Sequence, residues 1–188
     1  MTAAALPLTL KTSPSVADCV GRVLIVAGLC FGAANLVQWA VVSGAFHLHP
    51  AVLGLSWPAA VTVFLITVGR IRKTAGDAGR RVAGWSRLGV LTLICSALAL
   101  LAASVATGDW GLVAWNSMAS PMAYGAAWGI AALRAGRPNM ALPSLIGFGG
   151  AAAVAATVGT ADQYLACATT LALVAFLPGA ALARGLRI

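Results

Sequence analysis

The chain has 188 residues, of which 61% are hydrophobic and only 9% are charged, and it contains no Glu. A soluble domain of this length is about one quarter charged and cannot bury so much apolar surface in one core. The composition therefore excludes an ordinary soluble domain and predicts an all-α polytopic membrane protein. The net charge of +8 does not indicate nucleic acid, because the basic residues lie in short segments between apolar runs.

The first apolar run is preceded by Ser15, with Asp18 three residues later, which is the pattern of a capped helix start. The run is longer than the apolar region of a signal peptide, which is about 7–15 residues. We therefore interpret it as a membrane span, for which about 20 residues are needed. The whole chain, residues 1–188, is predicted to form one domain of six spans, at residues 21–44, 51–69, 88–107, 112–133, 140–159 and 164–183.

The stretch between the second and third spans, residues 70–87, is the most basic part of the chain and is expected to be a loop. With six spans, every Lys and Arg falls on one side of the membrane. The other side then holds only four ionisable side chains, His47, His49, Asp109 and Asp162. The positive-inside rule predicts that the basic side and both termini are cytoplasmic, in a bacterial-type inner membrane.

Membrane lipids are the first expected partners, and the basic stretch is expected to bind anionic headgroups. Clusters of about four to eight basic residues beside a membrane bind such lipids. The residues expected to do so are Arg72, Lys73, Arg80 and Arg81. An alternative is that these residues only set the topology.

A proline recurs in each span that returns to the basic side, at Pro58, Pro121 and Pro178. Together with the spacing from Arg22 to Cys30 and from Arg87 to Cys95, this pattern is compatible with three tandem helical hairpins. Each proline frees the carbonyl four residues earlier, and inside a membrane that carbonyl needs a partner. We interpret the prolines as kinks; the alternative is a broken-helix substrate site.

Two glycine pairs, Gly28-x-x-x-Gly32 and Gly125-x-x-x-Gly129, indicate close approach of helix backbones. Packing within the chain is the simpler interpretation. A homo-oligomer or a membrane partner bound through these glycine faces is the alternative.

Polar and aromatic side chains gather toward the non-cytoplasmic ends of several spans. In the first span, Asn35, Gln38 and Trp39 share one helix face, because their spacing is i, i+3, i+4. They predict a ligand-binding mouth with amide donors and aromatic walls; the alternative is an interfacial aromatic belt with hydrogen bonds between helices. The candidate site residues are Asn35, Gln38, Trp39, Trp57, Asn116 and Ser117.

The sequence contains no catalytic triad, P-loop or HExxH motif and does not predict an enzyme or a cofactor. His47-x-His49 is the nearest approach to a metal site, but two histidines in a short loop are more simply solvated, so no metal is predicted. Spans without mid-membrane charge argue against a proton relay.

We therefore expect a small-solute channel or facilitator for a neutral or weakly acidic solute. The alternative is a non-catalytic membrane subunit that binds or stabilises a larger membrane complex. Length, six spans and cytoplasmic termini are similar to the small bacterial acetate-uptake channels. Their Asn-Pro-Ala-Pro-Leu-Gly signature is absent, and the nearest stretch, Leu6-Pro7-Leu8, does not match it, so no residue roles follow from this resemblance.

Overall fold

The computed structural model describes residues 15–49 and 51–186, and every element in this part of the chain is helical. The α-helices are α1 (Val16–Val42), α2 (Ala51–Thr74), α3 (Gly76–Thr107), α4 (Ala119–Ala135), α5 (Ala141–Ala156), α6 (Asp162–Leu171) and α7 (Leu177–Ala183). Two 3-10 helices, η1 (Trp110–Met118) and η2 (Pro138–Met140), precede α4 and α5. A π-helical turn, η3 (Ala172–Phe176), joins α6 to α7.

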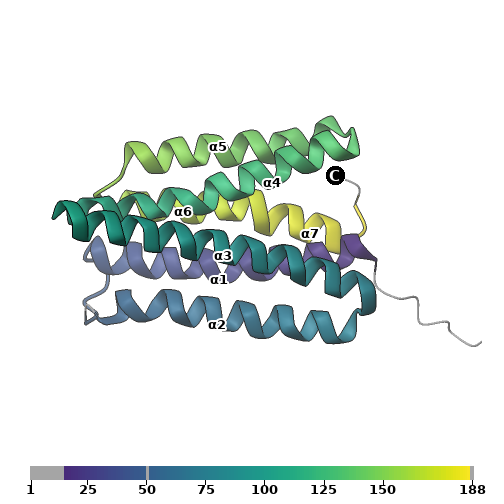
Figure 1. Cartoon of the computed structure of the whole chain (residues 1–188), viewed down its shortest axis with the longest axis horizontal. Coiled ribbons are helices and arrows are strands. Elements are labelled where there is room, and N and C mark those ends of the chain that lie inside the picture. Colours follow the sequence, from purple (N-terminus) through teal and green to yellow (C-terminus); the bar gives the residue numbers. More distant parts are fainter. Residues whose placement is uncertain (1–14, 50, 187–188) are drawn as a thin grey trace, which may run out of the picture.

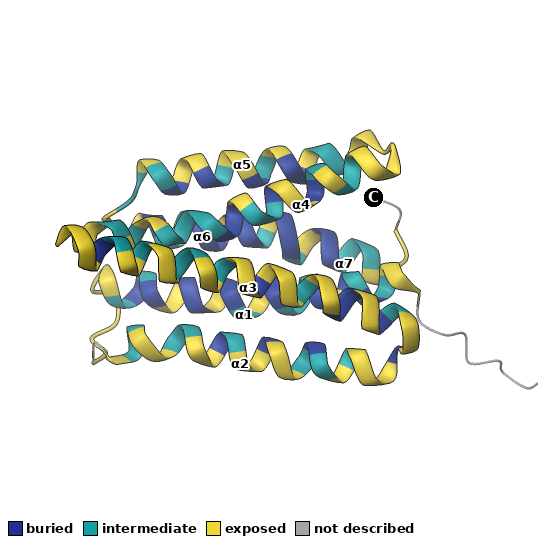
Figure 2. Ribbon diagram, in the orientation of Figure 1, coloured by how far each residue is buried: buried dark blue, intermediate teal, exposed yellow. Residues whose placement is uncertain are grey.

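The long helices lie side by side in one bundle (Figure 1). The helix α1 is central and packs against α2, α3, α6 and α7, while α5 packs against α4 and α6 on the side away from α2. Buried positions concentrate on α1 and on α6 to α7, whereas α2 and α3 are mostly exposed (Figure 2).

Five helical stretches are long and apolar enough to cross a membrane: α1, α2, α3, Pro138–Ala156 and Asp162–Ala183. At about 1.5 Å per residue, the part of α3 from Arg87 to Thr107 is about 30 Å long, which matches the hydrocarbon thickness of a bilayer. Large apolar side chains, such as Leu91 and Leu98, are exposed along it. This is the architecture of a helical, multi-pass membrane protein.

The basic stretch of residues 70–87 is not a loop, and this prediction was wrong. The helix α2 continues to Thr74, α3 begins at Gly76, and only Ala75 separates them. The turn is possible because Gly76 adopts a φ of +58° and because Gly79 packs closely on α2. A β-carbon at Gly79 would lie 2.5 Å from the carbonyl oxygen of Ile71. The basic residues therefore lie on two extended helix ends.

The fourth expected span, residues 112–133, is not one α-helix. It begins as η1, and α4, with 17 residues, is only about 25 Å long. Pro121 explains the change, because a proline lacks the amide hydrogen that would bond to the Ser117 carbonyl. As the third residue of α4 it lies in the first turn, where that amide has no partner within the helix.

Other helix boundaries follow the predicted ones closely. Ser15 and Asp18 form a reciprocal capping box at the start of α1, as predicted. The segments between the third and fourth expected spans and between the fourth and fifth contain Gly108 and Gly136, which adopt the left-handed conformation after α3 and α4. The last expected span, 164–183, corresponds to Asp162–Ala183, although a π-helical turn interrupts it before Pro178.

Three of the four paired glycines meet other helices of the same chain. A β-carbon at Gly28 would lie 2.8 Å from the backbone nitrogen of Phe176, and one at Gly147 would lie 2.7 Å from the backbone of Gly125. Gly129 meets Ser144 in the same interface between α4 and α5. Packing within the chain is thus observed for these glycines, while Gly32 has no such close neighbour.

Candidate functional site

A cavity of about 550 Å³ lies among α1, α2, α3 and α4. It exists because α3 packs against η1 near one end of the bundle and against α2 at the other, while it makes little contact with α4. Figure 1 shows α3 and α4 diverging toward the end where α3 begins. The lining residues are Val16, Val20, Val23, Leu24, Phe31, Trp57, Phe64, Arg81, Val82, Trp85, Ser86, Gly89, Val90, Leu93, Ser120, Ala123, Tyr124 and Ala127.

The inner wall of the cavity is aromatic. The ring of Phe31 stacks on Trp57 with centroids 5.7 Å apart, and it also contacts Phe64 at 5.2 Å. These three rings bring α1 and α2 together at the deep end. Tyr124 and Ser120 of α4 and Ser86 of α3 supply hydroxyl groups to a mostly apolar lining. Such a surface holds an apolar group and offers few hydrogen bonds.

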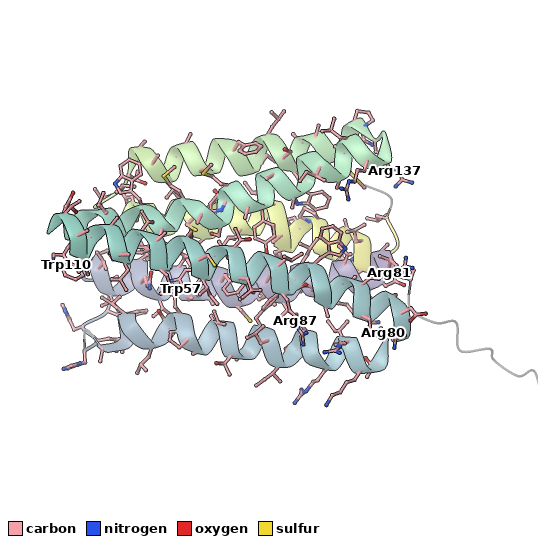
Figure 3. All side chains as sticks on the ribbon, in the orientation of Figure 1. Trp57, Arg80, Arg81, Arg87, Trp110 and Arg137 are labelled. Atoms are coloured by element: carbon pink, nitrogen blue, oxygen red, sulfur yellow. The ribbon has the colours of Figure 1, made fainter. Side chains whose placement is uncertain are left out.

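The other end of the cavity is cationic. Arg81 lies in the second turn of α3 and is the one charged residue of the lining. Its neighbour Arg80 is paired with Asp77, but Arg81 makes no hydrogen bond or ion pair with the described residues. Figure 3 shows Arg80, Arg81 and Arg137 at this end of the bundle and Trp110 at the opposite end. An acidic group in the cavity would thus find an unpaired guanidinium at its mouth.

Of the six residues predicted to form an outer binding mouth, Trp57 is the one that lines this cavity. Gln38 donates to the Ser56 hydroxyl at 3.3 Å and to the Leu53 carbonyl at 3.5 Å, which ties α1 to α2. Asn116 accepts from the Ser96 hydroxyl at 2.9 Å, which ties η1 to α3.

The remaining three predicted residues do not form a shared site with Gln38 and Asn116. Ser117 donates to the Ala114 carbonyl in its own helix, and Trp39 is half-buried. Asn35 is fully buried, and its amide nitrogen donates to the Phe31 carbonyl at 2.8 Å. Its amide oxygen has no partner among the described residues. The polar residues are thus distributed over several helix contacts, and a shared solute site made by them stays a prediction.

Two of the three carbonyls freed by proline have identified partners. The Val174 carbonyl, freed by Pro178, accepts a 2.7 Å hydrogen bond from the Trp128 indole. The Ser117 carbonyl, freed by Pro121, receives the Cys167 thiol at 3.6 Å. Both donors come from another helix, which satisfies the requirement that a membrane interior imposes on backbone groups.

The sequence prediction missed Tyr124 and Trp128. They lie one helical turn apart on α4, and the spacing i, i+4 of two polar-tipped aromatics in the middle of an apolar run is a signal that could have identified them. Arg81 is predicted to be a lipid ligand but not to be part of a cavity.

The predicted lipid-binding residues Arg72, Lys73, Arg80 and Arg81 are all exposed on the two helix ends that flank Ala75. Their binding of anionic headgroups stays a prediction. His47 and His49 lie in the turn between α1 and α2, and the described residues contain no group of three or more potential metal ligands.

No protein-family model, curated protein or solved structure matches this chain. The features of this chain that bear on its function are therefore the cavity and the charge distribution.

Proposed function

We propose that this protein is a membrane facilitator for a small, weakly acidic solute, and that the cavity among α1 to α4 is the inner part of its path. The observation that carries the proposal is the combination of apolar and aromatic walls with one unpaired cation, Arg81, at the mouth. The cation attracts the ionised acid, and the apolar wall accommodates the rest of the molecule.

We also propose six crossings with both termini in the cytoplasm of an inner membrane. η1 and α4 together provide the sixth crossing, since nine residues at about 2.0 Å and 17 at about 1.5 Å give about 43 Å. The charge count supports this threading, because Lys and Arg then lie on one side only. Reporter fusions after residues 78 and 183 should report cytoplasm and one after residue 48 periplasm; a periplasmic signal at 78 would refute the threading.

The flux of a weak acid tests the facilitator proposal. Purified protein in liposomes should accelerate the uptake of labelled propionate above that of empty liposomes. Ala123→Phe should return uptake to the empty-liposome level, because Ala123 lines the cavity. Ala126→Phe is the matched control on the same helix, since Ala126 is exposed and outside the lining. Wild-type uptake equal to that of empty liposomes would refute the proposal.

A further inference from the structure

The shape of the cavity restricts the kind of acid that fits it. On α1 the lining extends from Val16 to Phe31, which is about 22 Å along the helix axis. On α3 it extends from Arg81 to Leu93, about 18 Å in the same general direction. The cavity is therefore long as well as apolar, and its cation lies near one end.

The side of the cavity between α3 and α4 is loosely packed. The helices α3 and α4 have few contacts with each other where they diverge, and both contribute to the lining there. Trp85, at the same level of α3, is exposed on the bundle surface and also lines the cavity. A tryptophan in this position is typical of the membrane interface.

The charge of the cavity lining determines which headgroup of a ligand can bind. The lining contains no Asp or Glu. Asp77 is paired with Arg80, and Asp18 belongs to the capping box of α1. Nothing acidic among the described residues neutralises Arg81. A guanidinium binds a carboxylate or a phosphate oxygen with charge-assisted hydrogen bonds.

We propose that the cavity binds an amphipathic anion with a single apolar chain, whose carboxylate pairs with Arg81 and whose chain extends along α1 and α3 toward Trp57. The ligand enters from the inner leaflet between α3 and α4. This inference rests on the proposed function and extends its solute class from small weak acids to long-chain monocarboxylates. An acyl chain of a phospholipid shares the chemistry, and the experiment below separates the two sources.

Quenching of tryptophan fluorescence by dibromostearic acid measures this binding in detergent. Bromine quenches a tryptophan at contact distance, so the wild type should show a saturable quenched component that Trp57→Phe reduces, while Trp85, which also lines the cavity, is still present. Arg81→Gln should raise the dissociation constant of that component about tenfold or more, because it removes the charge-assisted hydrogen bonds to the carboxylate. Arg80→Gln, which removes the neighbouring paired cation, should change it less than about twofold.

A second pair of variants tests the shape. Gly89→Leu places a side chain in the cavity, and a β-carbon there meets no atom within 4 Å, so the helix itself tolerates the change. Gly84→Leu is the control on the same helix, because Gly84 also has free space around it and lies outside the lining. The saturable component should disappear in Gly89→Leu and persist in Gly84→Leu, with the elution volume and helical circular dichroism of both proteins equal to those of the wild type.

The same quenching measurement with dibrominated phosphatidylglycerol tests whether the ligand is a phospholipid. If the phospholipid produces the component that is sensitive to Gly89→Leu and the free acid does not, the carboxylate assignment is wrong. If Arg81→Gln and Gly89→Leu both bind the acid like the wild type, the site itself is wrong. If the wild type binds no dibromostearic acid but passes propionate, this inference alone is wrong. If it binds the acid but passes no propionate, the facilitator proposal is wrong and the binding site remains.

Discussion

The two halves of the bundle are packed in different ways. In the apolar 18-residue part of α1 and in that of Asp162–Ala183, 44% of the residues are buried, compared with 17% in that of α2 and 11% in that of α3. Between α1 and α7 the backbones themselves touch, because a β-carbon at Gly21 would lie 2.8 Å from the backbone of Gly179. Around α3, by contrast, glycines such as Gly84 and Gly89 have free space.

This difference shows where the bundle is rigid and where it can accept a ligand. Small residues allow helices in a membrane to gain van der Waals contact over their full length. Helices that border a void lose this van der Waals contact. Helices α2 and α3 lack a glycine interface with each other beyond their shared turn, and the cavity lies beside them. We therefore regard α1 with α4 to α7 as the scaffold, and α2 with α3 as the side that can adjust.

The largest effect expected from this comparison is that of Gly28→Leu. Its β-carbon would overlap the backbone of Phe176, which cannot rotate away, so the cost should exceed the usual range of about 1–3 kcal/mol for overpacking. Thermal unfolding in detergent, followed by size-exclusion chromatography, measures it. Gly84→Leu on the adjustable side should unfold within a few degrees of the wild type, and equal losses in the two variants would contradict the division into scaffold and adjustable side.

A smaller effect is expected for Trp128→Phe. The change leaves the Val174 carbonyl without its donor in the interior, where an unsatisfied group costs about 1–3 kcal/mol. Measured hydrogen bonds in membranes average about 0.6 kcal/mol, so we expect a loss of about 1 kcal/mol. The control is Trp115→Phe, because Trp115 is exposed and makes no hydrogen bond in the described structure. If both variants have the same free energy of unfolding, the indole does not stabilise the π-helical turn that contains Val174.

Hydropathy predicted the apolar segments but not where each helix ends. Residues 70–87 were expected to be a loop because they are charged, yet charge only marks where the chain leaves the hydrocarbon. Backbone hydrogen bonds continue both helices into the basic stretch, so that α2 ends only at Thr74 and α3 already begins at Gly76. The capping box at Ser15 and the turn glycines depend on local geometry, and these were predictable from the sequence.

The candidate site was less predictable, because a cavity depends on how helices distant in the chain are spaced. Asn35 and Gln38 were expected to act together, since they share a helix face, but Gln38 bonds to α2 while Asn35 bonds within α1. Arg81 was recognised as basic but not as unpaired, because only the structure shows that Asp77 is taken by Arg80. Which helices leave space between them is not encoded in any single segment.

The one-residue turn at Ala75 has a consequence for proteolysis. A stretch with six basic residues would normally be the first place for trypsin to cut, and proteases act on exposed, locally unfolded loops. Here the basic residues from Arg70 to Arg87 belong to α2 and α3, and Ala75 itself is buried. The protease would have to unwind a helix end before its active site could reach the backbone. The most cleavable part of the sequence is thus protected by its secondary structure.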